Sequence, residues 1–133
     1  MAVSTPRPHR ESFDLEGISH SVPIPFGTRV GNTVFSSGIM GVDPASGQLA
    51  EGLAAQVRFA FSNMESLLRK AGGTPEDVGH IRVLVPEESY RSAVNEEWLR
   101  AFPDERSRPA RHTVVTPLRG GMLVQLEMVA VLR

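Results

Sequence analysis

Arginine is the residue type in this sequence that best suits the binding of small acids. Of the 14 cationic side chains 13 are arginine, and the single lysine is Lys70. A guanidinium held in place by a fold binds a carboxylate through a planar fork of N–H donors, although a high arginine content is also typical of a GC-rich genome. Lys70 lies among helix-surface residues, where a Schiff base with pyridoxal phosphate is not expected.

A second candidate for chemistry is Glu127, the only charged residue between positions 122 and 132. A carboxylate in such an apolar strand needs an explanation, and an ion pair with Arg119 or Arg133 at the sheet edge would be one. In residues 110–116, strand alternation places Arg111 and Thr113 on one face and His112 on the other, where packing or an interface is the expected role of the histidine.

Metal and thiol chemistry are not expected. The sequence has no cysteine, which removes disulfides and thiolate ligands and fits a reducing cytoplasm. His9, His20 and His80 show no metal-ligand spacing, so we predict no metal and no other cofactor.

Length and charge exclude several classes of protein. A chain of 133 residues has room for one domain, which we take to span residues 1–133. The net charge of −1 gives no overall field that would gather nucleic acid or an anionic membrane. The first residues lack the apolar segment of a secretory signal, and no apolar run reaches the roughly 18 residues of a membrane span, so a cytoplasmic protein is expected.

The periodicity of the sequence predicts alternating strands and helices. Residues 1–22 are polar and proline-bearing and are expected to form an extended arm that is ordered only by docking. Strands are expected at 28–30, 33–37, 81–85, 110–116 and 122–132, with a glycine-rich loop at 38–47. An amphipathic helix is expected from Leu53 to Gly72-Gly73, and a second is expected after a Ser89 cap, with Ala93, Val94, Trp98 and Leu99 on one side.

This order predicts an α+β fold in which a mostly antiparallel sheet carries two helices on one face. In the last strand both alternating sets of residues are largely apolar, which indicates that both faces of the sheet are covered. Since the chain has no third layer for the second face, we expect another subunit to cover it.

The motifs together resemble the Rid family of reactive intermediate deaminases, which hydrolyse enamines and imines. The stretches that carry the resemblance are Val30-Gly31-Asn32, Phe35 to Gly38, Asp43-Pro44, Ala71-Gly72-Gly73, Val94-Asn95, Arg108 to Arg111 and Glu127 to Val131. They remain in register over residues 23–133. The resemblance implies a chorismate-mutase-like homotrimer with its sites between subunits.

It also implies roles for individual residues. Arg111 of the Pro-Ala-Arg segment would bind the substrate carboxylate, and Glu127 would orient the hydrolytic water. Ser37, Gly38, Asn95 and Thr113 would line the pocket, although Ser37 and Asn95 could equally make only local hydrogen bonds. Where studied members have a tyrosine and a glutamine, this chain has Ile24 and Ile39, so we expect these two residues to line a less polar pocket that accepts longer or more apolar side groups.

The leading hypothesis is a cofactor-free hydrolase that converts 2-aminoacrylate-like 2-imino acids to 2-keto acids and ammonia. A variant of it is a pathway-specific deaminase of a larger unsaturated amino acid such as an aminomuconate. A second class is a non-catalytic trimer that binds a small carboxylate. The family's older label as ribonucleases or translation inhibitors gives a third class, which the net charge and the 6% aromatic content disfavour.

Overall fold

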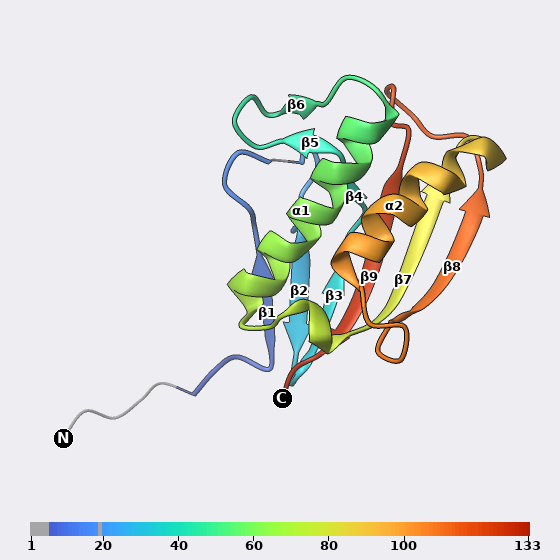
Figure 1. Cartoon of the computed structure of the whole chain (residues 1–133). Helices are drawn as coiled ribbons and strands as arrows, with labels where there is room; N and C mark the ends of the chain where they lie inside the picture. The colour runs from blue at the N-terminus through green and yellow to red at the C-terminus, as the bar shows by residue number, and fades with distance from the viewer. Residues whose placement is uncertain (1–5, 19) are drawn as a thin grey trace.

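The computed structural model describes residues 6–18 and 20–133, and its main feature is one sheet covered by two helices. The strands follow the order β1-β2-β3-β9-β7-β8, and β4 pairs with β9 beyond the end of β3. Helices α1 and α2 lie side by side on one face of this sheet (Figure 1). The strands are β1 Arg10–Phe13, β2 Gly27–Val30, β3 Thr33–Ser36, β4 Ile39–Met40, β7 Val78–Val85, β8 Ala110–Val115 and β9 Gln125–Val131.

The direction of the strands confirms the predicted fold class. Strand β7 runs parallel to β8, and the other described strand pairs of the main sheet are antiparallel. The sheet is therefore mostly antiparallel with two helices on one face, as the alternation of sequence periods indicates.

Helix α1 (Leu53–Ala71) turns its apolar face to the sheet. Its apolar residues recur at steps of three and four, and those buried on the sheet include Val57, Ala60, Phe61, Met64, Leu67 and Leu68. The helix ends where the sequence predicts, because Gly72 takes a left-handed φ of 92° that a side chain would disfavour. The N–H of Gly73 then donates to the carbonyl of Leu68 at 2.7 Å, which satisfies one of the last helix carbonyls.

A buried amide on α1, that of Asn63, organises the segment that was expected to be a loop. The Asn63 Nδ2 group donates to the carbonyls of Met40 and Val42 at 3.1 and 2.8 Å. Residues 38–47 are therefore more ordered than predicted: they contain β4 and the strand β5 Val42–Asp43, which pairs with β6 Gln48–Leu49. The signal that the sequence analysis missed is the apolar stretch Ile39-Met40-Gly41-Val42, in which Ile39 and Val42 are both buried.

Helix α2 (Arg91–Ala101) follows β7 through the 3₁₀ turn Glu88–Tyr90. The predicted Ser89 cap is wrong, because Ser89 lies inside this turn and its hydroxyl donates to the Glu87 carboxylate. Trp98 is buried against the sheet as expected, whereas Leu99, assigned to the same side, is 54% exposed. The helix thus presents a narrower apolar face than its sequence suggests.

The N-terminal segment is part of the sheet rather than a docked arm. Strand β1 pairs with β2 in antiparallel register, and Phe13, Leu15 and Ile18 are buried. Within the arm expected over residues 1–22, residues 10–13 thus form a regular strand, which the sequence analysis did not predict because the apolar residues Phe13, Leu15 and Ile18 are interspersed with polar ones. Residues 1–5 and residue 19 of this arm lie outside the described residues.

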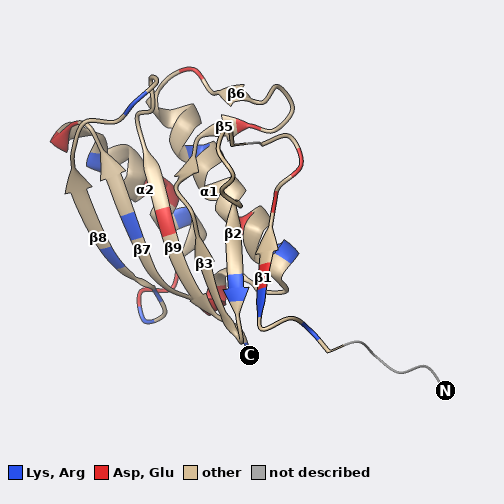
Figure 2. Ribbon diagram, turned by 180° about the vertical axis from the view of Figure 1, so that it is seen from behind, with Lys and Arg blue, Asp and Glu red and all other residues tan. Residues whose placement is uncertain are grey.

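The face of the sheet away from the helices is open in a single chain, and Figure 2 looks onto it. In β9 the alternation follows the prediction: Leu126, Met128 and Ala130 are buried under the helices, whereas Val129 and Val131 belong to the open face. Phe35 of β3 lies opposite Val129 and is 41% exposed, and Val131 is 51% exposed. An apolar strip formed by these three residues, Phe35, Val129 and Val131, therefore remains uncovered within one chain. Among the described helices, neither is long and apolar enough to cross a bilayer.

Candidate active site

Arg111 lies at the edge of the sheet, where β8 meets α2. Its Nε donates to the Thr113 hydroxyl at 3.1 Å, and its Nη2 donates to Oδ1 of Asn95 at 2.7 Å. The guanidinium carbon lies 5.1 Å from the centre of the Trp98 ring, a cation–π distance. We call Arg111, Thr113, Asn95 and Trp98 the arginine cluster; it fixes the guanidinium from three sides.

The local sequence explains this arrangement. Arg111 and Thr113 alternate onto the same face of β8, as expected from the strand period. Asn95 and Trp98 are three residues apart in α2, so both side chains face the strand. The ring of Trp98 makes an edge contact with the ring of Phe102, and the two ring centres are 4.9 Å apart. This contact holds a rigid ring beneath the guanidinium of Arg111.

The guanidinium of Arg111 retains free hydrogen-bonding capacity. Two of the five N–H donors of an arginine are used on Thr113 and Asn95. Among the described residues no carboxylate forms an ion pair with it. Burial lowers the pKa of Arg111, and the nearby charge of Arg91 lowers it further, so an incoming anion would stabilise the charged form. This is the electrostatic setting of a carboxylate-binding site.

A second group of predicted site residues lies where β3 ends and β4 begins, opposite β9. It consists of Ser37, Gly38 and Glu127. Three residues, 36–38, separate the pairs Phe35–Val129 and Ile39–Leu126, where β9 has only two, 127 and 128. Since the Ser36 hydroxyl accepts from the Met128 N–H at 2.8 Å, Ser37 and Gly38 together oppose Glu127. The extra residue makes a β-bulge, a device that re-aims backbone groups beside functional sites. We call Ser37, Gly38 and Glu127 the bulge cluster.

Each member of the bulge cluster also has a local partner. The Ser37 hydroxyl donates to the carbonyl of Pro25 at 2.7 Å, which ties the bulge to the loop before β2. Gly38 leaves no room for a side chain, because a Cβ there would lie 1.8 Å from Nε2 of Gln125. Glu127 forms an ion pair with Arg82, its cross-strand neighbour on β7, at 3.8 Å. The sequence analysis named Arg119 or Arg133 as the ion-pair partner of Glu127, and the structure gives Arg82 instead.

The two residues that depart from the family pattern, Ile24 and Ile39, lie in different environments. Ile24 is 49% exposed in the loop that Ser37 holds, so it is free to line a pocket. Ile39 has no exposed surface: it pairs with Leu126 in β4 and belongs to the core under α1. The expectation that Ile39 lines the pocket is therefore wrong, because residue 39 points to the helix side of the sheet after the bulge.

Within one chain the arginine cluster and the bulge cluster do not meet. Strands β7 and β9 lie between β8 and β3, so Arg111 and Ser37 are three strand spacings apart, about 14 Å at roughly 4.8 Å each. The two clusters also use opposite faces of the sheet. A single chain therefore offers two separate halves of the predicted site.

Sequence reasoning missed three residues that the structure brings to these clusters. Trp98 was assigned only to the core, yet it supports the guanidinium of Arg111. Arg82 alternates with the buried Ile81 and Val83 and so had to face the open side, where it meets Glu127. Arg91 lies one helical turn before Asn95, a spacing that could have linked it to Arg111 once Asn95 was placed there.

His112 lies on the open face beside Arg82, away from Arg111, as strand alternation predicted. The described residues contain no group of three or more His, Cys, Asp or Glu side chains that could hold a metal ion.

Comparison with known proteins agrees with this fold. The family model described as endoribonuclease L-PSP matches residues 24–132. A RutC family protein of Aquifex aeolicus is 32% identical over 115 residues, which cover 82% of this chain and 92% of the relative. The human protein named 2-iminobutanoate/2-iminopropanoate deaminase is 34% identical over 104 residues, covering 77% of this chain and 74% of the relative.

A solved structure extends the match to the whole fold. The crystal structure of RidA from the Antarctic bacterium Psychrobacter sp. has a TM-score of 0.85 and 28% sequence identity, covering 92% of this chain and 99% of that chain. The chain therefore belongs to the endoribonuclease L-PSP family, the family of the Rid proteins that its sequence resembles.

Proposed function

We propose that this protein hydrolyses 2-imino acids, formed from reactive enamines, to 2-keto acids and ammonia. The observation that carries the proposal is the state of Arg111: its guanidinium is oriented by Thr113, Asn95 and Trp98 yet has no carboxylate partner among the described residues. The names of the deaminase relatives at 30% identity or more support the same chemistry.

The proposed reaction needs only water. The enamine first tautomerises to the imine, and the carboxylate of the imino acid binds the free N–H donors of Arg111. The oxygen of a water adds to the imine carbon, and the nitrogen takes up protons as the tetrahedral adduct collapses. The C–N bond breaks, ammonia leaves, and the carbon becomes the ketone of a 2-keto acid. Since imines hydrolyse readily, positioning and charge complementarity are sufficient sources of acceleration.

The proposal includes a site made by two copies of the chain in a homotrimer. The arginine cluster lies on an edge strand, and the bulge cluster of the same chain is too far away to share a small ligand. A neighbouring copy that covers the open face would bring its own Ser37, Gly38 and Glu127 toward Arg111. The apolar strip of Phe35, Val129 and Val131 supports an interface there.

In this arrangement Glu127 orients the attacking water and accepts one of its protons. We assign the backbone N–H of Gly38, which lies at the bulge beside the Gln125 side chain, to the developing polar atoms of the adduct. The exposed Ile24 supplies the apolar wall beside the substrate side chain. The pathway-specific variant, an aminomuconate-type deaminase, uses the same assignments with a larger substrate.

One observation favours a second candidate, a trimer that binds small carboxylates without catalysis. Glu127 is paired with Arg82, so its carboxylate is engaged in an ion pair and not held ready for a water. A ribonuclease is disfavoured, because the net charge of −1 and the pairing of Arg7, Arg100 and Arg133 with acidic residues leave little basic surface for a phosphate backbone.

The deciding experiment measures ammonia release by the purified protein from imino acids generated enzymatically in situ, ranging from small to aromatic. A rate well above the uncatalysed hydrolysis, lost in Arg111→Ala, supports the deaminase. Binding of keto acids through Arg111 without any acceleration of ammonia release would replace the deaminase with the non-catalytic binder.

A further inference from the structure

We propose that Arg91, together with Arg111, forms a subsite for a second carboxylate, so that the preferred substrates are imines of dicarboxylic amino acids. This inference rests on the proposed deaminase function and names the substrate class of the same site. Arg111 would hold the carboxylate next to the imine, and Arg91 would hold the carboxylate at the end of the side chain.

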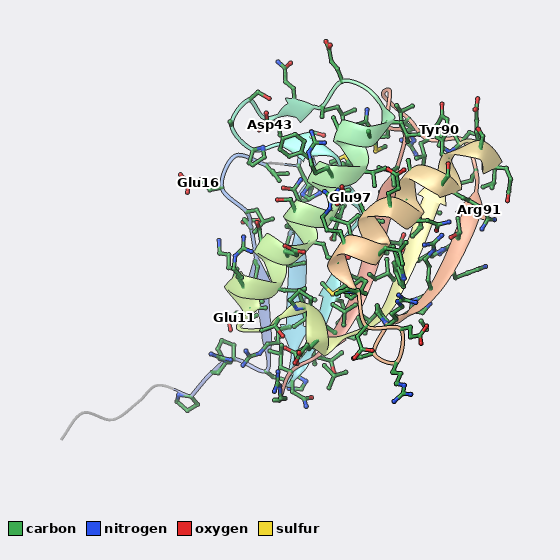
Figure 3. The ribbon with its side chains drawn as sticks, viewed as in Figure 1. Glu11, Glu16, Asp43, Tyr90, Arg91 and Glu97 are labelled. Atoms are coloured by element: carbon green, nitrogen blue, oxygen red, sulfur yellow. The ribbon has the colours of Figure 1, made fainter. Side chains whose placement is uncertain are left out.

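The position of Arg91 in α2 places it on the side of the helix that carries Asn95, the hydrogen-bond partner of Arg111. Arg91 and Asn95 are four residues apart, so they occupy the same face of the helix about 6 Å from each other. Oδ1 of Asn95 accepts from Nη2 of Arg111 at 2.7 Å. Figure 3 shows Arg91 at the N-terminal end of α2, on the side of the helix where β8 lies. The two arginines therefore both lie next to Asn95, on the side of α2 that faces β8.

The described residues do not balance the charges of Arg91 and Arg111. Glu88 is the one described acid that pairs with Arg91, and Arg111 has no acidic partner among the described residues. Two guanidinium groups and one carboxylate thus lie around Asn95. The charge of Arg91 contributes to the lowered pKa of Arg111, in agreement with the placement of both cations beside Asn95. Like charges so close favour an anionic ligand that can contact both.

The partner of Arg91 is well placed to give way to a ligand. The side chain of Glu88 is 70% exposed, and its contact with Nε of Arg91 lacks the alignment of a hydrogen bond. An ion pair whose acid is this exposed contributes little to stability, so a substrate carboxylate can replace Glu88 at low cost. A substrate with a neutral side chain makes no such exchange and gains nothing from Arg91.

The test compares two substrates of similar size, the imine of glutamate and the imine of leucine. We expect wild type to show the higher kcat/KM for the glutamate imine. Arg91→Gln should lower the ratio of the two kcat/KM values by roughly 10- to 100-fold, the effect of losing a charged hydrogen bond. The matched control is Arg100→Gln, which removes the same charge from the same helix and breaks the comparable pair with Glu97 at 2.9 Å. If Arg91→Gln changes the ratio no more than Arg100→Gln does, the subsite is refuted.

A second variant tests whether Glu88 competes with the substrate for Arg91. Glu88→Gln removes the carboxylate that occupies Arg91, so it should raise the ratio in favour of the glutamate imine several-fold. A ratio that falls in Glu88→Gln would mean that Glu88 orients Arg91 for substrate rather than competing for it, and this would overturn the proposed exchange.

Binding measurements separate this inference from the proposed function. Calorimetric titration with 2-oxoglutarate and with 4-methyl-2-oxopentanoate compares a dicarboxylate with a monocarboxylate of similar size without any turnover. If wild type hydrolyses no imine but binds 2-oxoglutarate more tightly in an Arg91-dependent way, the deaminase proposal fails and the subsite stands as a dicarboxylate-binding site. If imines are hydrolysed and the two keto acids bind equally in wild type and Arg91→Gln, the subsite alone fails.

Discussion

Arg111 and Glu127 lie on opposite faces of the same sheet. Arg111 and Met128 are both register partners of Ile81, so they share the helix side, whereas Glu127 is the partner of Arg82 on the open side. The contacts agree with this register: Arg111 touches Asn95 of α2, and Glu127 touches Arg82 of β7. One chain therefore cannot direct both side chains at a single small ligand, and any reaction that uses both residues needs two copies.

This relationship predicts complementation between two inactive variants. Arg111→Ala retains the bulge cluster, and Glu127→Gln retains the arginine cluster. When the two are co-expressed and mix at random, a site between neighbours has both residues with a probability of about one half times one half, so roughly a quarter of wild-type activity should return. Ammonia release by the purified mixture is the measurement. Activity no greater than the sum of the two separate variants would show that the residues do not share an intersubunit site.

Substitutions of Arg111 should separate its charge from its shape. Arg111→Ala should lower kcat/KM by about 10² or more, because the substrate loses its carboxylate contact and its orientation. Arg111→Lys should recover little, since an ammonium retains the charge but cannot donate to Thr113, Asn95 and a carboxylate in one plane. Circular dichroism is the folding control. Near-normal kcat/KM in the lysine variant would mean that the planar fork is not needed.

Much of the fold could be predicted from the sequence, because it depends on local periodicity. Helix α1, its end at Gly72 and the two faces of β9 follow from spacing alone. The bulge at Ser37 and Gly38 could not be predicted, since it exists only in the register between β3, β4 and β9. For the same reason the side of the sheet on which Ile39 lies was not predicted. Strict alternation from Thr33, without the extra bulge residue, would place Ile39 on the open face, whereas Ile39 is buried on the helix side. The contacts of Arg111 with Trp98 and Arg91 likewise depend on how α2 packs, which local periodicity does not encode.

Glu127→Gln should separate catalysis from binding. Glutamine retains the size and most of the hydrogen bonding of the carboxylate but not its basicity, so kcat should fall by roughly 10² while a keto acid still binds. The matched variant is Arg82→Gln, which frees Glu127 from its ion pair and is expected to affect kcat far less. Steady-state kinetics combined with keto-acid titration distinguish the two effects. Full activity in Glu127→Gln would assign the water to backbone groups and give the glutamate a structural role.

The apolar strip on the open face predicts a self-associating protein. We expect a homotrimer in native mass spectrometry at micromolar concentration. Val131→Asp places a charge where the wild-type side chain is 51% exposed in one chain, so it should convert the assembly to monomers without unfolding the chain. Leu99→Asp, at a similarly exposed position on α2, is the control and should leave the mass unchanged. A wild-type protein that stays monomeric would remove the intersubunit site.

The two isoleucines at the departures from the family pattern should respond differently to the same substitution. Ile39 is fully buried beside Leu126, so Ile39→Gln places an amide in the core without a partner and should lower the free energy of unfolding by about 2 to 4 kcal/mol. Ile24 is 49% exposed, and Ile24→Gln should change the free energy of unfolding by less than about 0.5 kcal/mol. Urea unfolding at one fixed protein concentration measures both, since association would otherwise shift the midpoints.

The same pair then tests which residue shapes substrate preference. Because the Ile24 side chain is available to the pocket, Ile24→Tyr should shift preference from the leucine imine toward the alanine imine at unchanged stability. Ile39→Val is the conservative core control: it removes one methylene group, should destabilise by roughly 1 kcal/mol, and should leave the ratio of the two kcat/KM values unchanged. If that ratio moves in Ile39→Val and not in Ile24→Tyr, then the core beneath the bulge, and not the loop before β2, determines the size of the pocket.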